Sequence, residues 1–222
     1  VFDAQGLMQG DRIAIIGGNR PLMYWSISAA QVLRAVPVPV YADATPEEMA
    51  TVLQDAEVRI AAVQDQEQVD KIIGANERLD FVGHILFDEE RGLADYESAR
   101  LVSMESAIEE AKALFARDPS ARERIVAKIE QGQGSDISIM LHTSGTTGKS
   151  KGVILSAERS VAAARDTAAF DRLNDRDEVL AYLPLAWVGD HYLNYAQAMV
   201  AGVCMACPES PDTMQQDLRE VG

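Results

Sequence analysis

The sequence is poor in cysteine and in basic residues, and each shortage disfavours a class of protein. Two cysteines in 222 residues cannot form a disulfide framework, which favours a reducing compartment and a cytoplasmic location. Lys and Arg total 20 against 35 Asp and Glu, a formal net charge of -15. Because such a surface repels the phosphates of nucleic acids and anionic lipids, we expect no nucleic-acid partner and disfavour a membrane-surface role.

Long apolar runs are also missing. The longest stretch without a charged residue, 191–208, contains His191, Asn194 and Gln197, so the pattern predicts a buried helix and strand and no transmembrane segment. No secretory signal stands at the start. The sequence begins without methionine and both ends read as cut, so we expect a piece of a longer protein. The hydrophobic content of 47% and charged content of 25% are ordinary for a globular domain and disfavour disorder.

The order of the apolar patterns predicts an α/β fold, with mostly parallel sheets flanked by helices. Residues 1–87 alternate four short apolar runs with three helical patterns, which is typical of a first β/α sheet unit. The run Val36–Val40 contains two prolines and is expected near a sheet edge. Thr45, followed by a proline and then by Glu48, has the pattern of a capping box at a helix start.

Two further regions complete a single, incomplete domain over 1–222. Residues 88–135 are rich in charge and read as a helical excursion without strands. Residues 136–222 open with a strand pair and continue with further β/α units, including a helix over Val188–Ala201.

The segment Thr143–Gly152 carries the chemistry. It consists entirely of Gly, Ser, Thr and Lys and stands between two apolar runs. Hydroxyls and backbone N–H groups suit the non-bridging oxygens of a polyphosphate, and lysines supply the opposite charge. Gly145 and Gly148 allow the backbone to approach a ligand closely. A flexible hairpin loop without a ligand is the alternative that composition alone leaves open.

A Walker A loop is excluded by spacing. That loop needs four residues between its first glycine and a Gly-Lys-Ser/Thr end, and it leads from a strand into a helix. Here only Thr146 and Thr147 separate Gly145 from Gly148, and Val153-Ile154-Leu155 reads as a strand.

Thr143-Ser144-Gly145-Thr146-Thr147-Gly148, followed by Lys151-Gly152-Val153, resembles the phosphate-binding signature of the adenylate-forming (AMP-binding) enzymes. This superfamily includes acyl-CoA synthetases, luciferases and peptide-synthetase adenylation domains. Leu183-Pro184-Leu185-Ala186 resembles the next family motif, and Val36–Tyr41 and Leu180–Trp187 are most similar to long-chain fatty acid–CoA ligases. The resemblance covers nearly the whole chain and implies part of the large N-terminal domain.

The resemblance implies an ATP-dependent fatty acid–CoA ligase. Such an enzyme forms an acyl-AMP from a carboxylate and ATP, and then transfers the acyl group to CoA. The implied cofactors are ATP and Mg²⁺, with CoA as co-substrate, and the implied partners are these small molecules. A non-catalytic nucleotide-binding or scaffolding relative, and an acyl-AMP ligase that does not use CoA, are the alternatives. The family's adenine, ribose and lid segments have no counterpart here, so we expect this piece alone to be inactive. The oligomeric state stays open.

The resemblance also assigns residues. The β- and γ-phosphates would be held by the loop, Lys151 would pair with them as the catalytic residue, and Thr143 would lie near Mg²⁺. The loop residues are Thr143, Ser144, Gly145, Thr146, Thr147 and Gly148. Ser150 stands where the family usually has proline, and Trp187 where it often has histidine. Trp187 and His191 share a helix face and are candidates for the acyl-substrate wall, with core packing equally open.

Two other patterns favour structural interpretations. Cys204 and Cys207 form a C-x-x-C, but no second pair completes a zinc site, so we predict buried thiols. His142 directly precedes the loop, where a packed strand-end histidine is favoured over a ligand contact.

Overall fold

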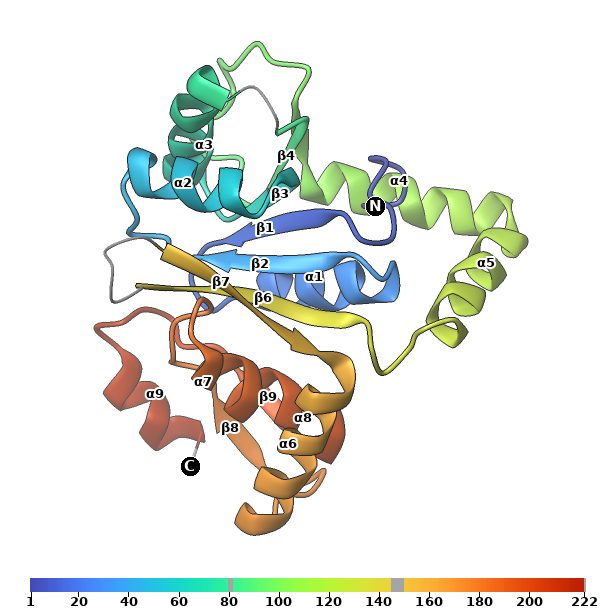
Figure 1. Ribbon diagram of the computed structural model, residues 1–222, viewed down its shortest axis with the longest axis vertical. Helices are drawn as coiled ribbons and strands as arrows, with labels where there is room; N and C mark the ends of the chain where they lie inside the picture. Colours follow the sequence, from blue (N-terminus) through green and yellow to red (C-terminus); the bar gives the residue numbers. More distant parts are fainter. Residues whose placement is uncertain (80–81, 145–149, 222) are drawn as a thin grey trace.

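The computed structural model describes residues 1–79, 82–144 and 150–221. Its centre is a five-stranded sheet in the order β2-β1-β3-β4-β5, and every pairing in it is parallel. Figure 1 shows this sheet with helices on either side. The α/β prediction is therefore confirmed. The strands are β1 (Arg12–Ile16), β2 (Val36–Val40), β3 (Val58–Val63), β4 (His84–Phe87) and β5 (Leu101–Ser103).

Alternate residues of β1 enter two different cores. Ala14 and Ile16 pack in one cluster with residues of α2 (Pro46–Asp55) and α3 (Gln66–Leu79). Ile13 and Ile15 pack in a second cluster with residues of α1 (Pro21–Val32). All four side chains are fully buried. The period of two along the strand thus places a helical layer on each face, and the four strands and three helices expected in 1–87 are all present.

The two prolines of β2 explain why this strand ends the ladder. The backbone N–H of Val36 donates to the carbonyl of Asp11, at the start of β1, over 2.8 Å. In a strand, the next N–H points the opposite way, so Pro37 and Pro39 stand on the side away from β1, where no donor is missed. The expected edge position is confirmed.

The capping box at the start of α2 is also confirmed. The backbone N–H of Glu48 donates to Thr45 Oγ1 over 3.3 Å, and the backbone N–H of Thr45 donates to Glu48 Oε2 over 2.9 Å. These two bonds satisfy N–H groups that the first turn of a helix leaves without partners.

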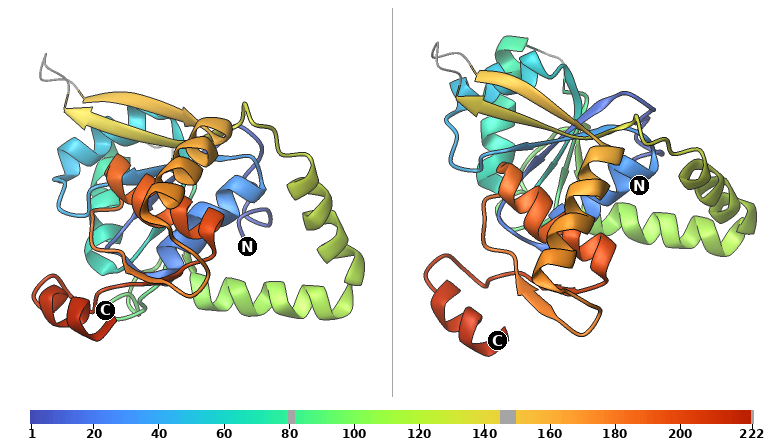
Figure 2. Two further views of the ribbon diagram at one scale, coloured as in Figure 1. Left: turned by 90° about the horizontal axis from the view of Figure 1, so that it is seen from below. Right: turned by 60° about the horizontal axis from the view of Figure 1, so that its bottom comes forward.

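Within residues 88–135, α4 (Met104–Arg117) and α5 (Pro119–Glu130) form an arm of two helices that projects from the body in Figures 1 and 2. The expectation that this region lacks strands is wrong, because β5 pairs with β4. Three residues are too few for a periodic pattern to register. The strand also ends at Ser103, whose hydroxyl caps α4 by accepting the N–H of Ser106.

The last third begins with an antiparallel hairpin of β6 (Ile137–Ser144) and β7 (Ser150–Ser156). Strand β6 lies beside β2 (Figure 1), but the two belong to separate sheets. Next come α6 (Ala157–Asp171), a parallel pair of β8 (Glu178–Leu180) and β9 (Cys204–Ala206), and α9 (Met214–Val221).

The helix expected over Val188–Ala201 is present but is not uniform. It runs as α7 (Val188–Asp190), a π-helical segment η1 (His191–Ala196) and α8 (Gln197–Ala201). Apolar periodicity did not predict the π-helical middle, a rare geometry that is frequent at functional sites. Within the described part of the chain, no helix is long and apolar enough to cross a bilayer.

Candidate functional site

The β6–β7 hairpin brings the two ends of the candidate phosphate-binding segment together. Thr143 pairs with Lys151, and Ser144 pairs with Ser150, at the end of the antiparallel ladder. Five residues of the predicted loop, Gly145, Thr146, Thr147, Gly148 and Lys149, lie outside the described residues, so their assignments stay predictions. The expected topology from strand to strand is confirmed by β6 and β7. Because Ser150–Ser156 is a strand, the exclusion of a Walker A loop is also confirmed.

Lys151 and Thr143 have the exposure and chemistry that a phosphate ligand requires. Both side chains are exposed. Lys151 has no ion-pair partner among the described residues, so its charge is available in a chain of net charge -15. The hydroxyl of Thr143 suits one position around Mg²⁺, which usually takes its other ligands from waters, carboxylates and substrate phosphates. Within the described ranges, no cluster of three or more His, Cys, Asp or Glu side chains could hold a metal.

The root of the hairpin is fixed to the body by polar contacts. Gln31 of α1 donates from Nε2 to the carbonyl oxygen of Ser138 over 2.8 Å. Just before β6, Asp136 receives two bonds from the guanidinium of Arg34, at 2.8 and 2.9 Å. Both side chains of this ion pair are about four-fifths buried, and the arginine lowers the pKa of Asp136. The fork-shaped pair fixes both the distance and the direction of the hairpin root.

His142 is a packed strand residue, as predicted. Its side chain is only 6% exposed, and its Nε2 lies 3.1 Å from Oδ2 of Asp55. Asp55 ends α2, so this contact joins the hairpin to a helix 87 residues earlier in the chain. No local pattern in the sequence pointed to this partner.

His191 lies inside the protein. It is 1% exposed, and its Nε2 lies 3.2 Å from both the Ser138 and the Ser160 hydroxyls. The ring stacks on Tyr195 with 5.6 Å between ring centroids. Burial lowers the pKa of His191 to about 4, so the imidazole is neutral near pH 7 and joins α6 and η1 to the hairpin root.

Trp187, unlike His191, lies at the surface. It is 48% exposed, and it is absent from the cavity of about 300 Å³ that His191 lines together with Ser138, Ser160 and Tyr195. The two candidates for the acyl wall stand one helical turn apart, since the His191 N–H donates to the Trp187 carbonyl over 3.4 Å, but they do not share this cavity. The contacts of His191 are those of a core residue. A contact of either side chain with an acyl group stays a prediction.

A buried carboxylate next to His191 was not identified from the sequence. Asp190 is 1% exposed, and its Oδ1 accepts bonds from Tyr24 at 2.8 Å, Asn194 at 2.8 Å and Asn19 at 3.2 Å. Burial raises the pKa of Asp190, and these three donors partly offset that effect. Asn19 also donates to the carbonyl of Leu183 over 2.8 Å. The cluster therefore fastens the Leu-Pro-Leu segment to the loop after β1.

The two cysteines depart from the prediction of buried thiols. Cys204 is exposed and Cys207 is half-buried. Strand β9 belongs to a two-stranded sheet near the surface (Figure 2), so its alternate residues do not all reach a core. Both cysteines are free.

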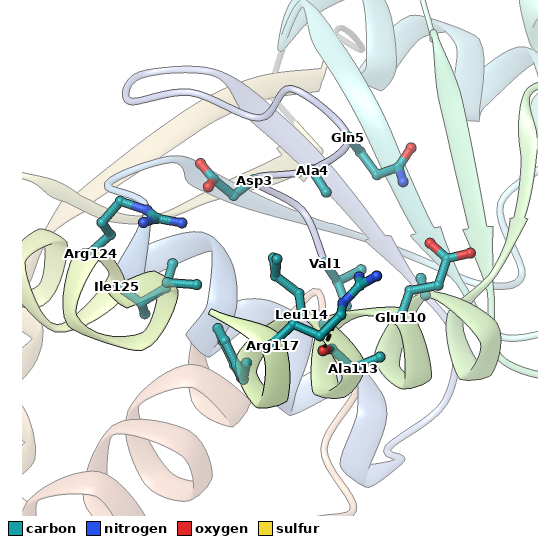
Figure 3. Close-up of a pocket in the computed structure, with 14 residues that line it drawn as sticks. Val1, Asp3, Ala4, Gln5, Glu110, Ala113, Leu114, Arg117, Arg124 and Ile125 are labelled. Carbon is teal, nitrogen blue, oxygen red and sulfur yellow. Dashed lines mark hydrogen bonds between the residues drawn. The ribbon is translucent and has the colours of Figure 1, made fainter. Parts of the chain in front are cut away.

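A cavity of about 500 Å³ lies away from the hairpin, between the α4–α5 arm and the N-terminal residues (Figure 3). It is lined by apolar side chains such as Leu114 and Ile125 and bordered by charged ones, including Arg117, whose Nε donates to the carbonyl of Ala113. The residues that resemble a phosphate signature are not among its lining, so it is not the candidate site.

Comparison with known proteins agrees with this fold and hairpin. The model of the AMP-binding enzyme family matches residues 1–221, so the chain belongs to this family. It is 25% identical over 223 residues to the long-chain-fatty-acid–CoA ligase ACSBG1 of Rattus norvegicus, in an alignment that covers 97% of this chain and 30% of that protein. The chain thus spans about 30% of the length of this curated relative.

Two solved structures share the fold. A putative long-chain-fatty-acid CoA ligase from Rhodopseudomonas palustris CGA009 has a TM-score of 0.71 at 19% identity, over 99% of this chain and 50% of that one. ATP-bound MatB from Rhodopseudomonas palustris has a TM-score of 0.68 at 18% identity, over 99% of this chain and 40% of that one. The predicted membership of the adenylate-forming superfamily is confirmed, and so is the similarity to long-chain fatty acid–CoA ligases.

Proposed function

We propose that this chain is the phosphate-binding part of an ATP-dependent fatty acid–CoA ligase. The proposed reaction has two steps. A carboxylate oxygen attacks the α-phosphate of ATP, which gives acyl-AMP and pyrophosphate, and the thiolate of CoA then attacks the acyl carbon and releases AMP. The observation that carries the proposal is the pairing of Thr143 with Lys151 at the end of the hairpin.

Lys151 suits the task of charge neutralisation. Its ammonium group is exposed and has no ion-pair partner among the described residues, so binding a phosphate breaks no ion pair described there. Displacement at phosphorus involves little chemistry by side chains and depends mainly on positioning and charge stabilisation. Lys151 would hold the β- and γ-phosphates, where it stabilises the charge of the departing pyrophosphate.

Thr143 is proposed to contribute its hydroxyl to Mg²⁺ bound with the nucleotide. When bound, this ion neutralises charge on the phosphates. The remaining loop residues, Ser144, Gly145, Thr146, Thr147 and Gly148, are proposed to donate N–H and O–H groups to the phosphate oxygens. Trp187 is half-exposed one helical turn before the buried His191, and we retain it as a candidate for the acyl wall.

The fatty acid and CoA are proposed as substrates on the basis of the relatives. The names of the rat relative and of the CGA009 structure both include a long-chain fatty acid and CoA. A cytoplasmic location also remains a proposal, and it rests on the two free cysteines.

The test is an assay of the complete protein that contains this chain. Pyrophosphate release should require both ATP and a long-chain fatty acid, and acyl-CoA should form when CoA is added. Acyl-AMP that accumulates and does not transfer to CoA would instead support a ligase that does not use CoA. Nucleotide binding without pyrophosphate release would support the non-catalytic relative.

A further inference from the structure

The carboxylate of Asp55 lies at the C-terminal end of α2, a position that the helix itself makes unfavourable for an acidic group. Asp55 is the last residue of α2, and the last turn of this helix contains no basic residue. The C-terminal end of a helix carries partial negative charge, so an acidic side chain is unfavourable there. Its contact with His142, at 3.1 Å, supplies a hydrogen-bond donor that offsets this cost.

Gly152 leaves room for Met140 beside the hairpin ladder. It pairs with His142 across the hairpin. A Cβ atom at residue 152 would overlap Cε of Met140, whereas it would lie at ordinary van der Waals distances of 3.5 Å from His142 Nε2 and 3.6 Å from Asp55 Oδ2. The side chains of Met140, His142 and Asp55 therefore all lie against Gly152.

The contact lies one residue pair from the ends of the phosphate-binding segment. His142 pairs with Gly152, and the next pair along the ladder is Thr143 with Lys151. Gln31 holds the root of β6 at Ser138, and Asp55 holds the same strand at His142. Strand β7 gives little support on its own, since its residues from Lys151 to Ile154 are all exposed.

We propose that Asp55 is a positioning residue. Its bond to His142 fixes the hairpin in the position in which Thr143 and Lys151 can contact the phosphates of ATP. This inference rests on the proposed function, because it gives the hairpin a nucleotide to position. In this proposal Asp55 is not required to touch the substrate. It acts through His142, and a small displacement of a substrate-holding group is enough to weaken its contacts.

The chain offers a matched control for Asp55. Glu57 stands two residues later, and its carboxylate pairs with Arg12 and not with the hairpin. In the complete protein, Asp55→Ala should raise the KM for MgATP about five-fold and leave kcat and the KM for the fatty acid within two-fold. Glu57→Ala should change none of these constants.

His142 provides the second half of the test. His142→Ala should raise the KM for MgATP as Asp55→Ala does, and the double variant should be no worse than either single variant, because both remove the same bond. His142→Gln keeps an N–H donor at the end of its side chain and should recover part of the loss. Effects of the two substitutions that simply add would overturn the proposal.

A measurement without nucleotide separates this inference from the proposed function. Hydrogen exchange of the backbone amides in 139–144 and 150–154 should be faster in Asp55→Ala than in the parent protein, and unchanged in Glu57→Ala. If the parent has no ATP-dependent activity but this difference is found, the proposed function fails and Asp55 still holds the hairpin. Unchanged exchange in Asp55→Ala overturns the positioning role whatever the activity.

Discussion

The hydroxyl of Tyr24 donates a 2.8 Å hydrogen bond to the carboxylate of Asp190, across 166 residues of sequence. It joins the helix that follows β1 to the helical run that follows the Leu-Pro-Leu segment. Asn19 completes the connection through bonds to both Asp190 and the carbonyl of Leu183. The family motif around 183–186 is thus held by a buried carboxylate whose three donors are all uncharged.

Asp190 should make the protein less stable as pH rises through the acid range. Burial raises the pKa of its carboxyl above the ordinary value of 3.8, so the folded state binds this proton more readily than the unfolded state. Stability from this group is therefore present at low pH and is lost from about pH 4 upward. Asp190→Asn cannot titrate, so its free energy of unfolding should fall less between pH 4 and 6. Denaturant unfolding at a series of pH values measures this slope, and identical slopes in both proteins would contradict the prediction.

His191 should have the opposite effect on the pH dependence of stability, because it should make the protein less stable as pH falls. Burial lowers its pKa from 6.5 to about 4. Between these two pH values the unfolded state therefore binds a proton that the folded state does not bind. Stability from this group is complete above about pH 6.5 and falls as pH decreases toward 4, by up to about 3 kcal/mol.

His191→Gln keeps a hydrogen-bonding group near Ser138 and Ser160 and removes the titration. The variant loses the ring that stacks on Tyr195, so its unfolding free energy should be lower than that of the parent at pH 7. Because it has no titrating group at this position, that free energy should decline less on acidification. The same unfolding series measures it, with Asp190→Asn as the contrasting variant. A decline as steep as the parent's would rule out His191 as the titrating group.

The sequence predicted the parts of the fold that leave local patterns. The alternation of strands and helices in 1–87, the edge position of β2 and the capping box at Thr45 all depend on residues a few positions apart. The signature at 143–151 was recognised for the same reason. What the sequence missed depends on distant partners: the bonds from Asp55 to His142 and from Tyr24 to Asp190 span 87 and 166 residues. The periodicity of apolar residues gives no information about such a pairing.

Exposure was harder to predict than secondary structure. Cys204 is exposed because β9 belongs to a small sheet at the surface, and that position depends on tertiary packing. Trp187 and His191 stand four residues apart, but they differ in exposure for the same reason. The helix starts only at Val188, so Trp187 precedes it as the N-cap, exposed, while His191 is buried.

Lys151 should matter for activity and little for folding. Its side chain is exposed, so Lys151→Ala leaves no cavity in the protein. Loss of one charge-assisted contact with a phosphate should lower pyrophosphate release that depends on fatty acid by about ten- to a hundred-fold in the complete protein. The thermal midpoint should stay within a degree or two of the parent's, about the scatter expected for a neutral surface change. Steady-state rates and thermal unfolding of the same preparation check both parts, and an unchanged rate would remove Lys151 from the phosphate site.

The 222-residue chain on its own should have no ligase activity and at most weak affinity for ATP. It spans about 30% of the length of its rat relative, and the family resemblance implies that the adenine, ribose and lid segments lie outside it. The hairpin can offer donors and Lys151 to the phosphates, but it leaves the base and sugar without contacts. The family resemblance implies that closure over the reacting atoms, which excludes water, depends on a lid outside this piece. The net charge of -15 also repels an anionic nucleotide, and this repulsion is strongest at low ionic strength.

Titration of the isolated chain with MgATP by calorimetry, at low and at physiological salt, measures the affinity directly, with Lys151→Ala as the control for binding at the hairpin. Micromolar binding that Lys151→Ala abolishes, or acyl-AMP formed from a labelled fatty acid, would show that the residues within this chain already make up the site.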